Sequence, residues 1–240
     1  QTPNGPHTVH DPPTPGALMS PIALTSLIVV ANVVGAAMAL PQAVRLIRTR
    51  DASGVSSVWA GVSVAMNVWW LAYGLAERLW GLVPVSIVGV GLYLVIAGTL
   101  VRLRGRATVG ALGAGVLLAS GPLPVLLLAG WPAAGVAIGL GYGLQLAPAV
   151  VAAHRTRQLA GVSPATWLMA WTESAAWVAY GIAVVDPALL VGGAGGVLLP
   201  SLMLLRLALT GHRPLHCLLA APVRAVVGHR ARVADGRIAT

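Results

Sequence analysis

The sequence has no lysine, a single cysteine and few charged residues. All 15 basic residues are arginine, so a retinal-type Schiff base, which needs a lysine amine, is excluded. The lone Cys217 excludes an intramolecular disulfide. Charged residues make up 9% of the chain and hydrophobic residues 57%, whereas a soluble domain carries about a quarter charged residues. The composition therefore predicts an integral membrane protein.

Seven apolar runs in the 240 residues are long enough to cross a bilayer as helices. A spanning helix needs about 20 mainly apolar residues. The runs cover residues 18–40 (continuing to about 46), 58–76, 82–101, 108–129, 132–153, 165–184 and 188–209. We therefore expect an all-α membrane protein with seven transmembrane helices.

The arginines follow alternate runs. They lie after the first run (Arg45, Arg48, Arg50), the third (Arg102, Arg104, Arg106), the fifth (Arg155, Arg157), and at or beyond the end of the seventh (Arg206, Arg213, Arg224, Arg230, Arg232, Arg237). Only Arg78 falls on the other side, leaving 15 − 1 = 14 together. Because cytoplasmic loops carry the excess of basic residues, this predicts a multi-pass plasma-membrane protein with the N-terminus outside and the C-terminus in the cytoplasm.

The two ends of the chain are polar. Residues 1–17 are Pro-rich, lack a basic n-region and are expected to be a disordered extracytoplasmic lead without a cleavable signal peptide. Residues 210–240 form a basic cytoplasmic tail, which we expect to be attracted to anionic lipid.

The sequence contains an internal repeat: residues 148–183 resemble residues 41–76. The offset is 148 − 41 = 107, and 13 of 36 positions are identical, including R-T-R, G-V-S and W-x-A-Y-G. Both copies have the same orientation in the membrane, because their R-T-R segments lie on the same predicted side. A three-helix unit ends on the opposite side from where it begins, so one additional crossing must separate the copies. The sequence thus predicts a 3+1+3 architecture: a three-helix repeat at 18–103, a linker helix at 107–129 and a second, parallel repeat at 131–209.

The Pro41-Gln42 pair, the G-V-S after an arginine loop, the W-x-x-Y-G that closes the second run and the 3+1+3 count together resemble the SWEET and PQ-loop (MtN3-saliva-like) transporter superfamily. The resemblance covers about residues 18–210. It implies transport of a small polar solute, with a sugar as the first expectation, by alternating access between two three-helix bundles. Two alternatives stay open: a proton-coupled PQ-loop transporter of an amino acid or other charged solute, and a non-transporting receptor or sorting protein with the same fold.

Two prolines related by the repeat interrupt the hydrogen bonding of their helices. Pro41 removes the bond to the carbonyl of Ala37, and Pro148 does the same at Leu144, so both positions are expected to kink. The resemblance implies that Pro41, Gln42 and Pro148 act as hinges. Packing alone is the alternative, and Gln42 has no equivalent because Ala149 follows Pro148.

Trp70 and Trp177 each lie three residues before a tyrosine, Tyr73 and Tyr180, so each pair shares a helix face. An indole offers a stacking surface and one N–H donor. The resemblance implies that these tryptophans contact solute, and packing or anchoring at the interface is the alternative. The other tryptophans are assigned to that second class: Trp59, Trp69, Trp80, Trp131, Trp167 and Trp171.

Polar residues at membrane depth complete the predicted binding site. The resemblance places an Asn 16 residues after each of those tryptophans, but this chain has Ser86 and Gly193 there. Asn32 and Asn67 are expected to compensate, with hydrogen bonding between helices as the alternative.

Glu173 is the only carboxylate inside a predicted span, about 12 Å along its helix, where an acid is costly and usually functional. It shares a stripe with Trp177 and Tyr180, and its partner in the repeat is Met66. We expect it to bind solute or couple transport to protons; a structural, hydrogen-bonded glutamate is the alternative.

No phosphate loop, metal cluster or nucleophile with its base is found in the sequence. We expect no enzyme activity, no cofactor and no metal. The expected partners are a small-molecule solute and the bilayer, not nucleic acid, and homo-oligomerisation is left open.

Overall fold

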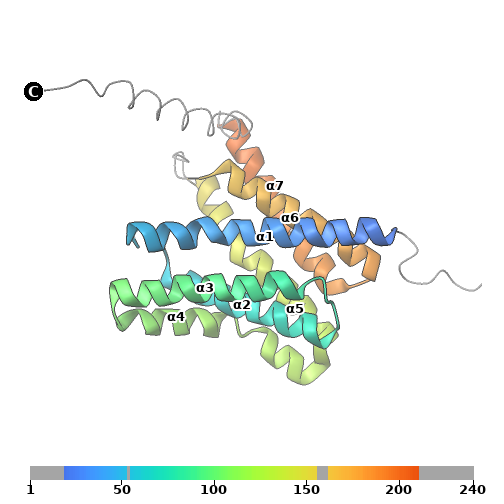
Figure 1. Ribbon diagram of the computed structural model, residues 1–240, viewed down its shortest axis with the longest axis horizontal. Coiled ribbons are helices and arrows are strands. Elements are labelled where there is room, and N and C mark those ends of the chain that lie inside the picture. Colours follow the sequence, from blue (N-terminus) through green and yellow to red (C-terminus); the bar gives the residue numbers. More distant parts are fainter. Residues whose placement is uncertain (1–18, 53–54, 156–161, 211–240) are drawn as a thin grey trace, which may run out of the picture.

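The computed structural model describes residues 19–52, 55–155 and 162–210, and all regular structure in these ranges is α-helical. Figure 1 shows the arrangement. The helices are α1 (Pro21–Thr49), α2 (Ser57–Ala76), α3 (Val83–Arg104), α4 (Ala107–Leu118), α5 (Pro122–Arg155), α6 (Pro164–Val184) and α7 (Pro187–Leu209). The predicted lead and all but the first residue of the predicted tail lie outside the described residues.

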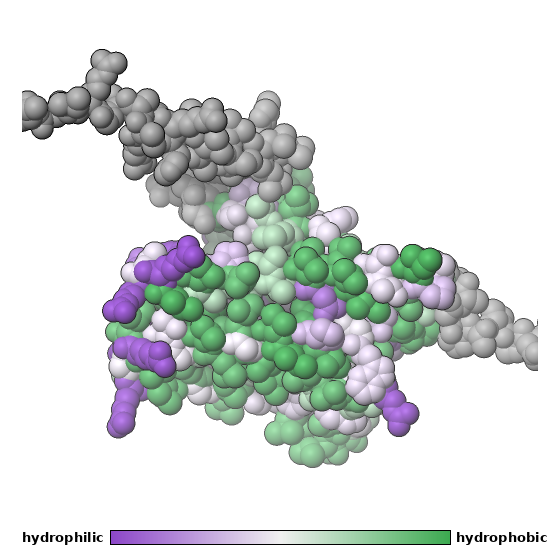
Figure 2. All heavy atoms as spheres, viewed as in Figure 1, coloured by the Kyte–Doolittle hydropathy of each residue, from purple (hydrophilic) through white to green (hydrophobic). Residues whose placement is uncertain are grey.

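Five helical stretches in the described part are long and apolar enough to span a membrane: α1, α2, α3, the stretch 107–155 and α7. The surface agrees with this assignment, because large apolar side chains such as Leu117 and Leu128 are 75% and 88% exposed. Figure 2 shows apolar residues over most of the visible helix surface and hydrophilic ones at its two ends. The expectation of an all-α protein with membrane-spanning helices is confirmed. At 21 residues α6 is long enough, but polar residues such as Thr172 and Glu173 lower its hydropathy.

The predicted continuous helix over 108–129 is interrupted in the structure. α4 ends at Leu118, and α5 begins at Pro122. Proline cannot donate the amide hydrogen bond that would continue α4, but it is well suited to the first turn of a new helix. A second break follows at Gly130, whose φ of 77° is a left-handed conformation that glycine adopts at little cost. At 12 residues, α4 extends only about 18 Å.

The repeated G-V-S motif has a structural role at the starts of α2 and α6. Ser56 accepts a hydrogen bond from the Trp59 amide at 3.2 Å, and Ser163 accepts one from the Thr166 amide at 3.4 Å. Each serine is therefore the N-cap of its helix and satisfies an amide that has no partner within the helix.

The helices pack in two equivalent sets. In the first half, α1–α3, helix α3 packs against both α1 and α2; in the second half, α5–α7, helix α7 packs against both α5 and α6. Between the halves, α1 packs on α6, and α2 packs on α5. α4 packs on α2 and α3, so it belongs to the first half.

We name the two ends of this bundle by their residues. The arginine end is where α1, α3, α5 and α7 finish, each with an arginine in its last turn. The tyrosine end holds Tyr73 and Tyr180, near the ends of α2 and α6.

Candidate functional site

A cavity of about 350 Å³ lies between the two halves. Its lining comes from α1, α2 and α3 on one side and from α5, α6 and α7 on the other. This volume is in the range of small-molecule sites in proteins, which start near about 300 Å³.

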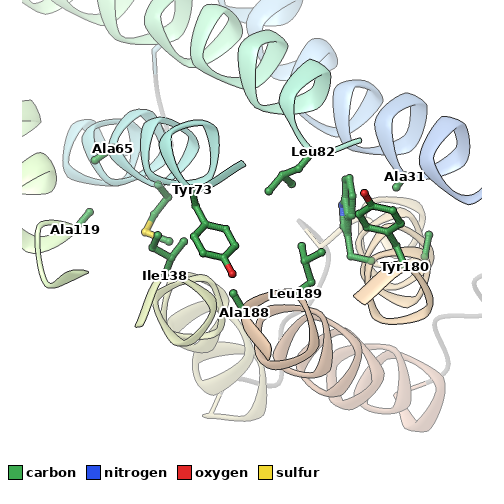
Figure 3. Close-up of a cluster of buried hydrophobic side chains, with 12 residues drawn as sticks. Ala31, Ala65, Tyr73, Leu82, Ala119, Ile138, Tyr180, Ala188 and Leu189 are labelled. Atoms are coloured by element: carbon green, nitrogen blue, oxygen red, sulfur yellow. The ribbon is translucent and has the colours of Figure 1, made fainter. Parts of the chain in front are cut away.

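At the tyrosine end, one apolar core joins the halves. Buried side chains of the first half, including Tyr73 and Leu82, pack with Tyr180 and Leu189 of the second. Figure 3 shows this cluster, with the Tyr73 ring directed from α2 toward Ala188 and the Tyr180 ring near Leu82 and Ala31. Leu82, Trp177 and Leu189 of this core also line the cavity, so the core adjoins it on this side.

At the arginine end, the described residues form two separate cores. One lies within the first half and is built around Leu46, Ile96 and Leu100. The other lies within the second half and includes Met203 and Leu207. Buried apolar packing therefore joins the halves at the tyrosine end and stays within each half at the arginine end.

Trp70 and Trp177 both line the cavity. Each ring meets the tyrosine of its own pair edge to face: the ring centroids are 6.2 Å apart for Trp70 and Tyr73, and 5.9 Å apart for Trp177 and Tyr180. The Trp70 indole also lies against Gly192 of the opposite half, where an added Cβ would be 3.1 Å from the ring. The two tryptophans thus line the cavity beside the apolar core, and each is packed against its own tyrosine.

The structure places Tyr73 and Tyr180 outside the cavity lining, although they were predicted to bind solute. The Tyr73 hydroxyl donates to Asp186 Oδ2 at 2.7 Å, and Asp186 Oδ1 caps α7 by accepting from the Leu189 amide at 2.8 Å. The Tyr180 hydroxyl lies against Gly81 in the other half, where an added Cβ would be 3.3 Å from it. Each tyrosine therefore connects its half to the turn before the third helix of the opposite half.

Ser86 and Asn67 line the cavity, whereas Asn32 does not. The Ser86 hydroxyl donates to Leu82 O at 2.9 Å, and Asn67 Nδ2 donates to Ser63 O at 2.8 Å, each within its own helix. Asn32 Nδ2 bonds the carbonyls of Ile28 and Gly81, and its buried Oδ1 has no hydrogen-bond partner. Asn32 therefore secures the α2–α3 turn against α1 and takes no part in the cavity.

Glu173 lies in the lining, and its Oε1 accepts a hydrogen bond from the Trp177 indole at 3.3 Å. Its carboxyl occupies space beside Gly35 of α1, where an added Cβ would overlap Oε1. Glu173 is the only charged side chain among the described residues that line the cavity.

Five further polar residues at or beside the cavity were not singled out from the sequence. Gln145 Nε2 donates to Ser63 Oγ at 2.8 Å, which links the two halves across the cavity. Tyr93 lies beside Ser63, and Tyr142 lies beside Ser174. Gln145 could have been found from the sequence as Asn67 was, because it is an amide inside an apolar run. Ser63 and Ser174 could not, because a serine is common in such runs.

The predicted hinge residues are spread over two sites. Pro41 and Pro148 both lie inside helices, α1 and α5. Gln42 lines the cavity, and Pro148 lines a second, more apolar pocket of about 920 Å³ between α2, α4 and α5. Gln42 and Gln145 line both, so the two spaces adjoin.

No group of three or more His, Cys, Asp or Glu side chains suited to a metal occurs among the described residues. A scan against protein-family models and a search of curated proteins find no match for this chain.

Proposed function

We propose that this protein is a membrane transporter that moves a small polar solute through the cavity by alternating access of the two halves. The observation that carries the proposal is the unequal packing of the two halves: one core joins them at the tyrosine end, and two separate cores lie at the arginine end. Such an arrangement fits a state that is open toward the arginine end and closed at the other.

The helix packing supports a 3+1+3 organisation with parallel repeats. If α1, α2 and α3 correspond to α5, α6 and α7, the packed pairs of the first half, α1–α3 and α2–α3, correspond to α5–α7 and α6–α7. The contact of α1 with α6 then corresponds to the contact of α5 with α2. This is the relation that two repeats about an axis along the membrane normal would have. In this proposal residues 107–129 provide the seventh crossing in two helical pieces.

We further propose that the protein belongs to the SWEET and PQ-loop superfamily. In this proposal it lies in the plasma membrane with its arginine end in the cytoplasm. The positive-inside bias supports this orientation. A sugar is the first solute to test because four tryptophans, Trp70 and Trp177 among them, line the cavity.

A proton-coupled transporter of a charged solute is the second candidate. It is favoured by Glu173, an acid that lines the cavity inside the bundle. Ionisable residues at membrane depth commonly mark substrate or proton pathways.

Uptake into proteoliposomes tests both candidates. Radiolabelled sugars and amino acids are offered with and without a pH gradient to the purified protein and to protein-free liposomes. We expect saturable uptake of at least one solute. Saturable binding without uptake would favour the receptor alternative, and neither binding nor uptake by folded protein would contradict a solute site.

Trp70→Ala and Trp177→Ala test the cavity within the same assay. Each loses a stacking surface worth about 0.5–1.5 kcal/mol, so uptake should fall by roughly two- to tenfold. The matched control is Trp171→Ala, because Trp171 is 38% exposed, donates to Ser201 at 3.0 Å and does not line the cavity. Equal losses in all three variants would instead indicate a general packing role for these tryptophans.

A further inference from the structure

The charge in the cavity belongs to one residue. Glu173 is the only acidic or basic side chain in the lining, and no arginine or histidine of the described chain faces it there. An acid inside a bundle is costly when it has no partner of opposite charge. Either the carboxyl is neutral, or its positive partner is the solute.

Aromatic rings surround this acid. Six of them line the cavity: Trp59, Trp70, Tyr93, Tyr142, Trp167 and Trp177. The Trp177 indole directly contacts the carboxylate through its N–H. Aromatic faces attract cations, and cages of such rings recognise quaternary ammonium groups.

Several polar groups of the lining are already engaged within the protein. Gln145 donates to Ser63, Asn67 donates to Ser63 O, and Ser86 donates to its own helix. The Glu173 carboxylate is the one charged acceptor of the lining, and its hydrogen bond is from Trp177 to Oε1. A ligand with a concentrated positive charge matches this acceptor better than a ring of hydroxyl groups does.

The repeat departs from symmetry at this place. The 107-residue offset pairs Glu173 with Met66, and Gly35, which leaves room for the carboxyl, with Tyr142. The α1–α6 contact therefore holds an acid in a space left by glycine. The equivalent positions on α2 and α5 hold a thioether and a phenol, so the charge in the cavity lies on one side only.

We propose that the cavity binds a small organic ammonium ion, with its positive charge beside Glu173 and its alkyl groups against the tryptophan and tyrosine faces. The role of this ion as a transported solute rests on the proposed function, but its binding can be measured without transport. It names the solute class that the second candidate function leaves open.

Choline and its neutral carbon isostere, 3,3-dimethylbutan-1-ol, are matched probes, since they differ in charge and scarcely in shape. Binding of each to the purified full-length protein in detergent is measured by titration calorimetry. We expect choline to bind more tightly by roughly tenfold or more, as a desolvated cation among aromatic rings and a carboxylate requires.

Variants of Glu173 test whether the preference for choline over the neutral isostere depends on this acid. Glu173→Gln should bring the two affinities to within about twofold, and Glu173→Asp should retain part of the preference. Glu77→Gln, at the exposed C-cap of α2, should behave as the unchanged protein. Binding of the neutral isostere to Glu173→Gln shows that the variant is folded. If that variant does not fold, the comparison of both probes on the unchanged protein still decides.

Equal binding of the two probes, no binding of choline, or an unchanged preference in Glu173→Gln overturns the inference. The outcomes for the proposed function are separate. Uptake of a neutral sugar by a protein that does not bind choline would leave transport standing and remove the ammonium site. Charge-selective choline binding without uptake of any solute would keep the site and contradict transport.

Discussion

Tyr73 and Tyr180 are the same residue in two copies of one motif, yet their hydroxyls have different partners. The Tyr73 hydroxyl donates to the carboxylate of Asp186, while the Tyr180 hydroxyl lies against Gly81. The difference arises because the repeat equivalent of Asp186 is Leu79. Only one of the two contacts that hold the tyrosine end closed is therefore made by an acid.

Removing the Tyr73 hydroxyl should weaken the closure at the tyrosine end. Tyr73→Phe keeps the ring but loses a hydrogen bond worth about 1–1.5 kcal/mol, so the population opened at this end should rise by roughly tenfold. The measurement is the rate at which a water-soluble thiol reagent labels Leu189→Cys in a Cys217→Ser background. Leu189 is 2% exposed and lies where the core meets the cavity.

The control for this prediction is a double-mutant cycle with Asp186→Asn, which retains a residue suited to the N-cap of α7. We expect the two single changes to accelerate labelling and the double change to add little to either. Independent, additive effects would mean that the hydrogen bond does not hold this end closed.

Among the elements, α4 is held to α2 by two reciprocal glycine contacts. An added Cβ at Gly115 would overlap the carbonyl oxygen of Val58, and one at Gly61 would overlap that of Leu112. Small residues of this kind let helices approach closely in a membrane, where apolar side chains gain little by leaving lipid. The pairing of α4 with the first half therefore depends on backbone proximity.

Two glycines of α4 form a matched test. Gly115→Ala places a methyl group against a backbone carbonyl that cannot turn away, and overpacking of this kind costs about 1–3 kcal/mol. Gly113→Ala meets nothing within 4 Å and should stabilise the helix by about 0.5–1 kcal/mol. Thermal unfolding in detergent should thus move in opposite directions. Shifts of the same sign and size would contradict the close approach of α4 to α2.

At the scale of the whole molecule, the unequal ends predict one-sided access to the cavity. Thr166 is exposed and lines the cavity near the start of α6, at the arginine end, whereas Leu189 lies in the core at the tyrosine end. In a Cys217→Ser background, Thr166→Cys should be labelled by an impermeant thiol reagent added on the arginine side. Leu189→Cys should resist the same reagent added on the tyrosine side.

The ratio of the two labelling rates reports the direction of opening. A solute that is transported should slow the labelling of Thr166→Cys by occupying the cavity and should change the rate at Leu189→Cys as the halves alternate. Fast labelling of both positions from both sides would describe an open channel and contradict alternating access.

The sequence alone determined the helical class, most helix bounds and the register of the duplication. Run length identifies spans because a bilayer demands about 20 apolar residues for each crossing. Five of the predicted runs match helices to within a few residues, and the run 132–153 matches the part of α5 that follows the break at Gly130. It missed the break between α4 and α5 because the run 108–129 is apolar throughout, although Pro122 is a helix-starting residue within it.

Only the tertiary structure decided which polar residues meet. Gln145 reaches Ser63 and Tyr73 reaches Asp186, contacts that span 82 and 113 positions in the chain. It also moved Tyr73 and Tyr180 out of the cavity lining and placed Trp59 and Trp167 in it. The physical reason is that lipid is as apolar as the interior of the bundle, so a spanning helix is hydrophobic on all sides. Hydropathy then reports that a segment crosses the membrane, while the face it turns inward is set by packing against the other helices.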